Sequence, residues 1–142
     1  MTPATLVGAG AGADTIRILA AAGAGGGDSG TFAVPGTNTI STTAFDVITG
    51  VKAGDKVQFA ATVGLYTGNA GAALGLVANG VAANTLVGLG VASNTIEIVR
   101  GTYDNTAKTF VGSATGTDSL FVYDSDAVVG TTAYEAVVLV GY

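Results

Sequence analysis

The stretch Asn94–Val111, NTIEIVRGTYDNTAKTFV, indicates the fold most directly. Polar and apolar residues alternate through Asn94–Arg100, which is the pattern of a strand with one buried face. Asp104 and Asn105 form a turn pair, and Lys108–Val111 (KTFV) returns as a second strand. The stretch therefore predicts a β-hairpin, with its two arms on either side of that turn.

Similar short segments, separated by glycine, proline and asparagine turns, recur along the chain and predict a mainly β protein. We expect a single sandwich or a short β-roll-like domain over residues 14–142, preceded by a Gly/Ala-rich arm over residues 1–13. The uncharged stretch Val57–Ile96 is compatible with buried strands and turns or with one apolar helix around Ala70–Val87. The other expected strands are Asp14–Leu19, Thr31–Val34, Thr37–Thr43, Ala44–Thr49, Lys56–Ala61, Ser119–Tyr123 and Tyr134–Val140.

The composition excludes several classes of function. The chain has 142 residues, 5 basic and 10 acidic side chains, and no cysteine, histidine or tryptophan. A disulfide framework, a zinc finger and a nucleophile–histidine triad are therefore excluded. The net charge of −5 and the absence of a basic cluster argue against a nucleic-acid partner. No constellation of residues points to an enzyme.

The hydropathy pattern raises the question of a membrane. The mean hydropathy is +0.56, which is high for a protein with so few charges. The stretch Val57–Ile96 is interrupted by asparagine, threonine and glycine and lacks flanking basic residues, so we expect no membrane span. The N-terminus has no basic region followed by an apolar run, so we expect no cleaved secretory signal. An apolar surface of this kind predicts packing against copies of the same chain.

Two segments have the pattern Gly-x-Asp-x-apolar, at Gly12–Ile16 and Gly116–Leu120. In calcium-binding β-roll repeats the glycines form a tight turn, the aspartate ligates calcium, and the apolar residue begins a strand. Asp14 and Asp118 are therefore candidate calcium ligands. The alternative is a glycine-rich turn followed by a strand that happens to begin near an aspartate.

A second kind of candidate is the carboxylate pair Asp124 and Asp126. Two carboxylates two residues apart in a turn offer oxygen ligands to a hard cation, whereas a solvated turn explains them equally well. Three other interpretations are weaker: a carboxylate pair of the glycosidase type, a dinucleotide fingerprint at Gly8–Gly12, and an ice-binding threonine face at Thr37–Thr43.

Three segments resemble the C-terminal modules of repeats-in-toxin proteins, most closely the small surface modules called bluetail domains. They are Ala44–Val57 (AFDVITGVKAGDKV), Gly101–Asp126 (including GTDSLFVYDSD) and Tyr134–Gly141 (YEAVVLVG). The resemblance implies export by type I secretion, an extracellular or cell-surface location, and calcium. The residues that match as calcium candidates are Asp14, Asp46, Asp55, Asp118, Asp124 and Asp126. The tandem glycine-rich array of a full β-roll is not present.

Two functions follow as hypotheses. The first is a secreted structural protein that self-assembles into an extracellular filament or surface layer, stabilised by calcium, with the type I export machinery as a transient partner. In it, the strand Thr5–Val7 of the arm adds to an open sheet edge of a neighbouring copy. The second is a C-terminal secretion or binding module of a larger adhesin or hydrolase.

Overall fold

The computed structural model describes residues 35–51, 84–89, 97–122 and 136–141 in full, and residues 5–7, 15–19, 31–33, 56–61, 64–69, 82–83, 96, 123 and 133–135 as strand backbone. In these residues the fold is all-β, as the sequence predicts, with no helix. The strands are β1 (Thr5–Val7), β2 (Thr15–Leu19), β3 (Thr31–Ala33), β4 (Thr39–Ser41), β5 (Asp46–Thr49), β6 (Lys56–Ala61), β7 (Gly64–Asn69), β8 (Ala82–Ala83), β9 (Ile96–Asp104), β10 (Thr109–Gly112), β11 (Asp118–Tyr123) and β12 (Ala133–Leu139).

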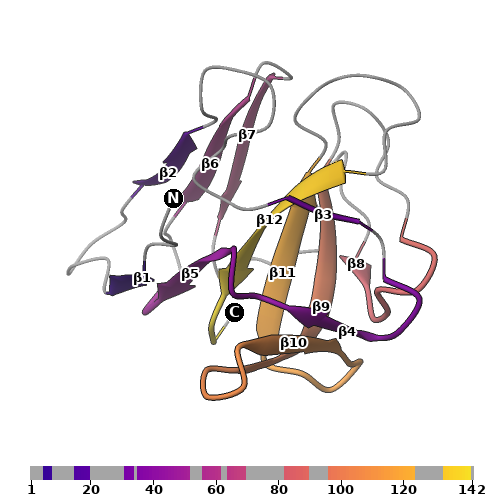
Figure 1. Cartoon of the computed structure of the whole chain (residues 1–142). Coiled ribbons are helices and arrows are strands. Elements are labelled where there is room, and N and C mark those ends of the chain that lie inside the picture. The colour runs from indigo at the N-terminus through magenta and orange to yellow at the C-terminus, as the bar shows by residue number, and fades with distance from the viewer. Residues whose placement is uncertain are drawn as a thin grey trace.

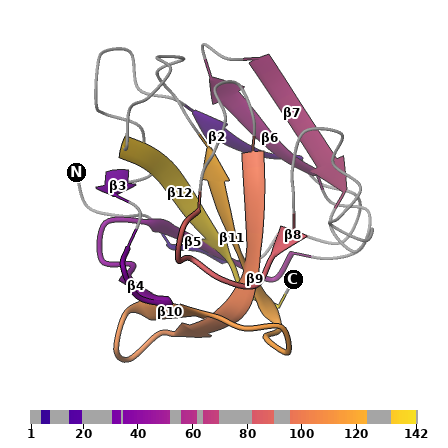
Figure 2. The ribbon, with the colours of Figure 1, turned by 90° about the vertical axis from the view of Figure 1, so that its right-hand side faces the viewer.

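Six strands form a curled, mixed sheet resembling half a barrel, in the order β5-β12-β11-β9-β10-β4 (Figure 1). The β5–β12 pair is parallel and the other neighbours are antiparallel. At one end β1 extends the sheet by pairing with β5 in parallel. Strand β3 pairs with β12 and β8 pairs with β9, whereas β2-β6-β7 form a separate sheet (Figure 2).

The core lies on the concave side of the curled sheet. Alternate residues of β11 and β12, together with the aromatic rings of Phe45 and Phe110, are buried there. Leu86 and Leu89 pack into the same cluster from the segment after β8. The opposite face of the central strands is also buried, at Ile48, Ile98, Phe121, Val137 and Leu139. Burial on both faces explains why β11 and β12 have continuous apolar runs rather than strict alternation.

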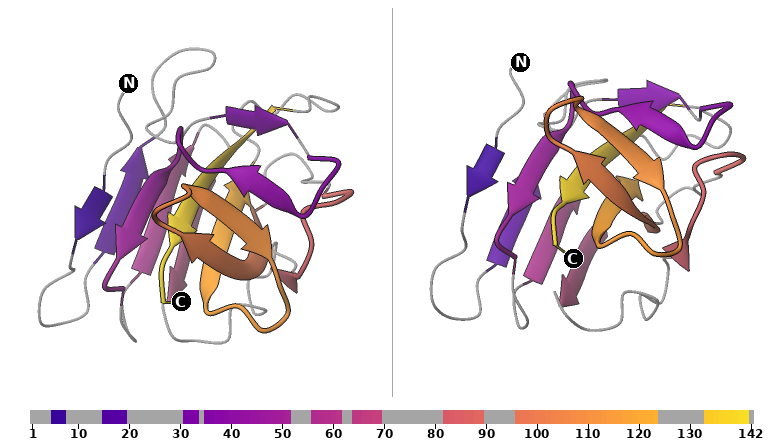
Figure 3. Two further views of the ribbon diagram at one scale, coloured as in Figure 1. Left: turned by 60° about the horizontal axis from the view of Figure 1, so that its bottom comes forward. Right: turned by 90° about the horizontal axis from the view of Figure 1, so that it is seen from below.

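The sheet curls where β9 exchanges one strand partner for another. Gly101 is paired with Asp118 of β11 and with Gly112 of β10. Beyond Gly101, β9 continues to Asp104 along β10 only. The predicted hairpin is thus confirmed, although its first arm extends four residues beyond the expected end at Arg100. The curl brings β10 and β4 over the end of the core (Figure 3).

Candidate functional site

Asp118 is the predicted site residue whose surroundings the structure describes most completely. Its side chain is buried, with 5% of its surface exposed. Oδ2 accepts a hydrogen bond from the backbone N–H of Tyr103 at 2.8 Å, and Oδ1 accepts one from the backbone N–H of Gly141 at 2.8 Å. The Asp118 carboxylate thus links two segments. One is the end of β9 that pairs with β10 but not with β11, and the other is the turn that follows β12. This geometry explains the burial of Asp118 without a cation.

Gly116 explains how Asp118 reaches that position. The loop between β10 and β11 folds against β9, with Ser113 N–H donating to the carbonyl of Arg100 at 2.9 Å. A Cβ atom on Gly116 would overlap the backbone of Gly101. The glycine predicted from the Gly-x-Asp pattern is therefore required for close approach of two backbones. Calcium binding at Asp118 stays a prediction.

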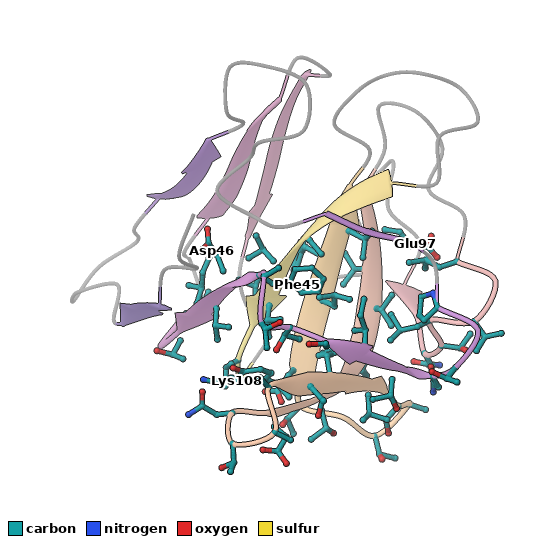
Figure 4. All side chains as sticks on the ribbon, viewed as in Figure 1. Phe45, Asp46, Glu97 and Lys108 are labelled. Atoms are coloured by element: carbon teal, nitrogen blue, oxygen red, sulfur yellow. The ribbon has the colours of Figure 1, made fainter. Side chains whose placement is uncertain are left out.

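Asp46 begins β5 and is half-buried, with its Cα in register with Val137 of β12. In Figure 4 it lies on the other side of the fold from Glu97 and well away from Lys108. Within the described residues no three acidic, histidine or cysteine side chains gather into a group that could hold a metal ion. Asp14, Asp55, Asp124 and Asp126 lie outside the described residues, so their role as calcium candidates stays a prediction.

The β9–β10 hairpin carries a cluster of polar groups at its tip. Oδ1 of Asp104 accepts hydrogen bonds from the backbone N–H groups of Thr106 and Ala107, at 2.7 and 2.9 Å. These bonds lower the pKa of the exposed Asp104 carboxyl. Lys108 adopts a left-handed φ of 53°, and its Nζ donates to Oδ1 of Asn105 at 2.7 Å. All these bonds lie within the hairpin and stabilise its turn.

Glu97 is a half-buried carboxyl group on β9, opposite Val122 of β11. Desolvation raises the pKa of this carboxyl above its usual range. The folded state therefore retains the Glu97 proton at a higher pH than the unfolded chain does. Its contribution to stability is fully present below the unfolded pKa and is lost as the pH rises through the folded pKa.

We expect Glu97→Gln to make the protein more stable than wild type at pH 7 and about equally stable near pH 4, where Glu97 is largely protonated in both states. Urea unfolding over a pH series measures the difference. Asp104→Asn is the control of opposite sign. The pKa of Asp104 is lowered, so its contribution exists above the unfolded pKa and is lost as the pH falls through the folded pKa. Parallel pH profiles for wild type and Glu97→Gln would contradict the expectation.

Among the described strands β4 pairs only with β10, so its other edge has no strand partner there, a feature that sequence reasoning did not single out. Thr42 N–H donates to the carbonyl of Lys108 at 2.8 Å, and Gly112 N–H donates to the carbonyl of Asn38 at 3.0 Å. Asn38 and Thr42 thus direct backbone groups toward β10. The backbone N–H and C=O groups of successive residues point to opposite sides of a strand, so those of Thr39 and Ser41 point away from β10.

The side chains along this edge are small and polar. Thr39 and Ser41 are exposed, and residues 36–44 contain no charge. Natural edge strands are usually protected by lysine, by proline or by a bulge. In the described residues, β4 is protected by its short length and by the Thr37 hydroxyl, which donates to the carbonyl of Thr39 at 3.2 Å. The signal in the sequence is the run TNTISTT, which has high β-propensity and no charge.

The chain matches no family model, and searches of curated proteins and of solved structures found no significant match. In the part of the chain that is described, no helix has the length and apolar character needed to cross a membrane.

Proposed function

We propose that the protein is a secreted structural subunit that self-assembles at the cell surface or into an extracellular filament, stabilised by calcium. The observation that supports this most is the uncharged edge of β4, which no second described strand covers, at one end of a sheet whose other end is β1. An end-to-end contact between these two different edges does not close on itself, so it propagates from copy to copy. The proposed role is structural rather than enzymatic.

The burial of Phe121, Ile98 and Val137 on the face opposite the core supports a finer description of the fold. Apolar side chains on both faces of a central sheet require a second covering layer. We therefore propose a two-layer sandwich, with the sheet β2-β6-β7 as the second layer, in preference to a β-roll. The antiparallel pairing through β11, β9 and β10 supports the same choice.

Ser41→Lys tests the assembly. Ser41 directs its backbone outward and its side chain is exposed, so lysine there adds a charge to the edge without entering the core. We expect wild type to elute as large oligomers in millimolar calcium and Ser41→Lys to elute as a monomer with nearly the same melting temperature. Size-exclusion chromatography with light scattering measures the masses.

Thr102→Lys is the matched control for this experiment. Thr102 is exposed on the part of β9 that pairs only with β10, opposite Val111, and lies on neither β4 nor β1. The same charge at that position should leave the oligomers intact. A compact wild-type monomer in millimolar calcium would overturn the proposal and favour a module of a larger adhesin or hydrolase. If Ser41→Lys assembles as wild type does, the β4 edge is not the surface through which the copies associate.

Calcium has its own expected result. An ion that binds only the folded state at one hundred times its Kd stabilises that state by about 2.7 kcal/mol. For a domain of this size that corresponds to an increase in Tm of roughly 10 °C for each ion bound. Differential scanning calorimetry in calcium, in magnesium and in chelator measures the shift. Magnesium requires stricter octahedral geometry and should have little effect. Equal melting temperatures in calcium and chelator would remove calcium from the proposal.

A further inference from the structure

We infer that β1 is an exchangeable strand, which leaves the β5 edge of its own chain and completes the β5 edge of a second copy. This inference rests on the proposed self-assembly and specifies the segment that would connect one copy to the next. The partner is a second copy of this chain, because β5 already pairs with this segment in a defined register.

The position of β1 in the sheet favours exchange. It is the outermost strand of the larger sheet, beside β5 (Figure 3). Its pairing joins Thr5 to Val47, Leu6 to Ile48 and Val7 to Thr49, and no other described strand pairs with it. A three-residue strand with one neighbour contributes few hydrogen bonds, so its release is among the least costly local openings of the molecule.

The pairing of β5 on its other side does not involve β1. Strand β5 keeps its parallel pairing with β12 when β1 leaves, and the Val140 N–H still donates to the carbonyl of Ile48 at 2.9 Å. The β5 edge that receives a foreign β1 therefore stays paired with the rest of the sheet.

Exchange conserves the contacts of the pair. The same three residues can pair with the same three partners within one chain or between two chains, so the pairing energies are nearly equal. At high protein concentration the second contact, at the β4 edge, then favours the pairing between chains. If each copy donates β1 forward and receives one from behind, the chain of contacts stays open and extends into a filament.

Single-cysteine variants of this cysteine-free chain provide the test. Val7→Cys and Thr49→Cys are prepared separately, mixed under conditions in which wild type assembles, and oxidised. Because these two residues are opposite each other in the register, we expect a disulfide-linked dimer of the two variants on a non-reducing gel. The mixture of Val7→Cys with Thr102→Cys is the control, since Thr102 lies on β9 and should give no such dimer.

The outcomes separate this inference from the proposed function. Suppose that light scattering shows assembly, but that the Val7–Thr49 pair gives no more disulfide-linked dimer than the Val7–Thr102 pair. That result would overturn strand exchange and leave self-assembly intact. If the wild-type protein does not assemble at all, both strand exchange and the proposed function are overturned. The double variant Val7→Cys/Thr49→Cys, kept dilute, should form its disulfide within one chain and shows that both cysteines are tolerated. Thr5→Cys with Val47→Cys repeats the test at the other end of the register if Thr49→Cys does not fold.

Discussion

Replacing Gly116 with alanine is expected to lower the free energy of unfolding by about 3 kcal/mol or more, which is at the upper end of the range for overpacking. The added Cβ would overlap the Cα, the carbonyl carbon and the carbonyl oxygen of Gly101. These are backbone atoms of β9, which pairs with β11 and β10 at that residue, so they cannot rotate away as a side chain could. Urea unfolding followed by far-UV circular dichroism measures the loss.

Gly36→Ala is the matched control. A Cβ at Gly36 meets no atom within 4 Å, and the residue does not adopt a left-handed conformation. Alanine there should be neutral or slightly stabilising, because it reduces the conformational freedom of the unfolded chain. Similar losses from Gly36→Ala and Gly116→Ala would show that the close approach to Gly101 is not what Gly116 provides.

The comparison of these two glycines shows what sequence reasoning could reach. The Gly-x-Asp pattern drew attention to Gly116 and Asp118 as parts of a calcium turn, which stays a prediction. The glycine is needed because two chain segments 15 residues apart approach closely. That approach depends on how the sheet curls at Gly101, which is a long-range property that no local pattern carries.

Local patterns performed well where local physics decides the structure. Lys56–Ala61 is a strand with the predicted bounds, and the Asp104–Asn105 turn joins the two arms of a hairpin.

 The parallel pairing of β5 with β12 is different, because Val137 pairs with Asp46, which lies 91 residues earlier in the chain. Pairing at that separation depends on the whole chain, so neither segment could predict it.

The candidate site was predictable only in part, for the same reason. Asp118 was marked by its motif, but its two hydrogen-bond donors are 15 and 23 residues away, in β9 and after β12. The open edge of β4 depends on which strand pairs with β10, and the run TNTISTT alone does not say that it lies at the end of a sheet. Sequence patterns identified residue types and turns, whereas the partners required the fold.

Asp118→Ala is expected to lower the free energy of unfolding by about 3 kcal/mol or more, because a hydrogen bond to a charged acceptor contributes about 1.5–3 kcal/mol and two are lost. The N–H groups of Tyr103 and Gly141 would also lose their acceptor at a partly buried position. Asp118→Asn should lose about half as much, since its amide offers one oxygen acceptor while its NH₂ group faces the second N–H. Urea unfolding in chelator measures both variants.

Asp104→Ala is the matched control for this comparison. Asp104 also accepts two backbone hydrogen bonds, but it is exposed and both donors belong to its own turn. Water replaces those bonds when the carboxylate is removed, so the loss should be a small fraction of the loss at Asp118. Equal losses at the two positions would contradict the argument that burial and long-range partners make Asp118 important.

Repeating the Asp118→Asn measurement in calcium separates the two roles of this carboxylate. If Asp118 acts only as an acceptor for Tyr103 and Gly141, the loss of stability is the same in calcium and in chelator. If Asp118 also ligates calcium, the loss is larger in calcium, because the variant forfeits the binding energy that stabilises the folded state. A loss seen only in calcium would show that the two backbone hydrogen bonds contribute little by themselves, and that the ion holds the end of β12 against β9.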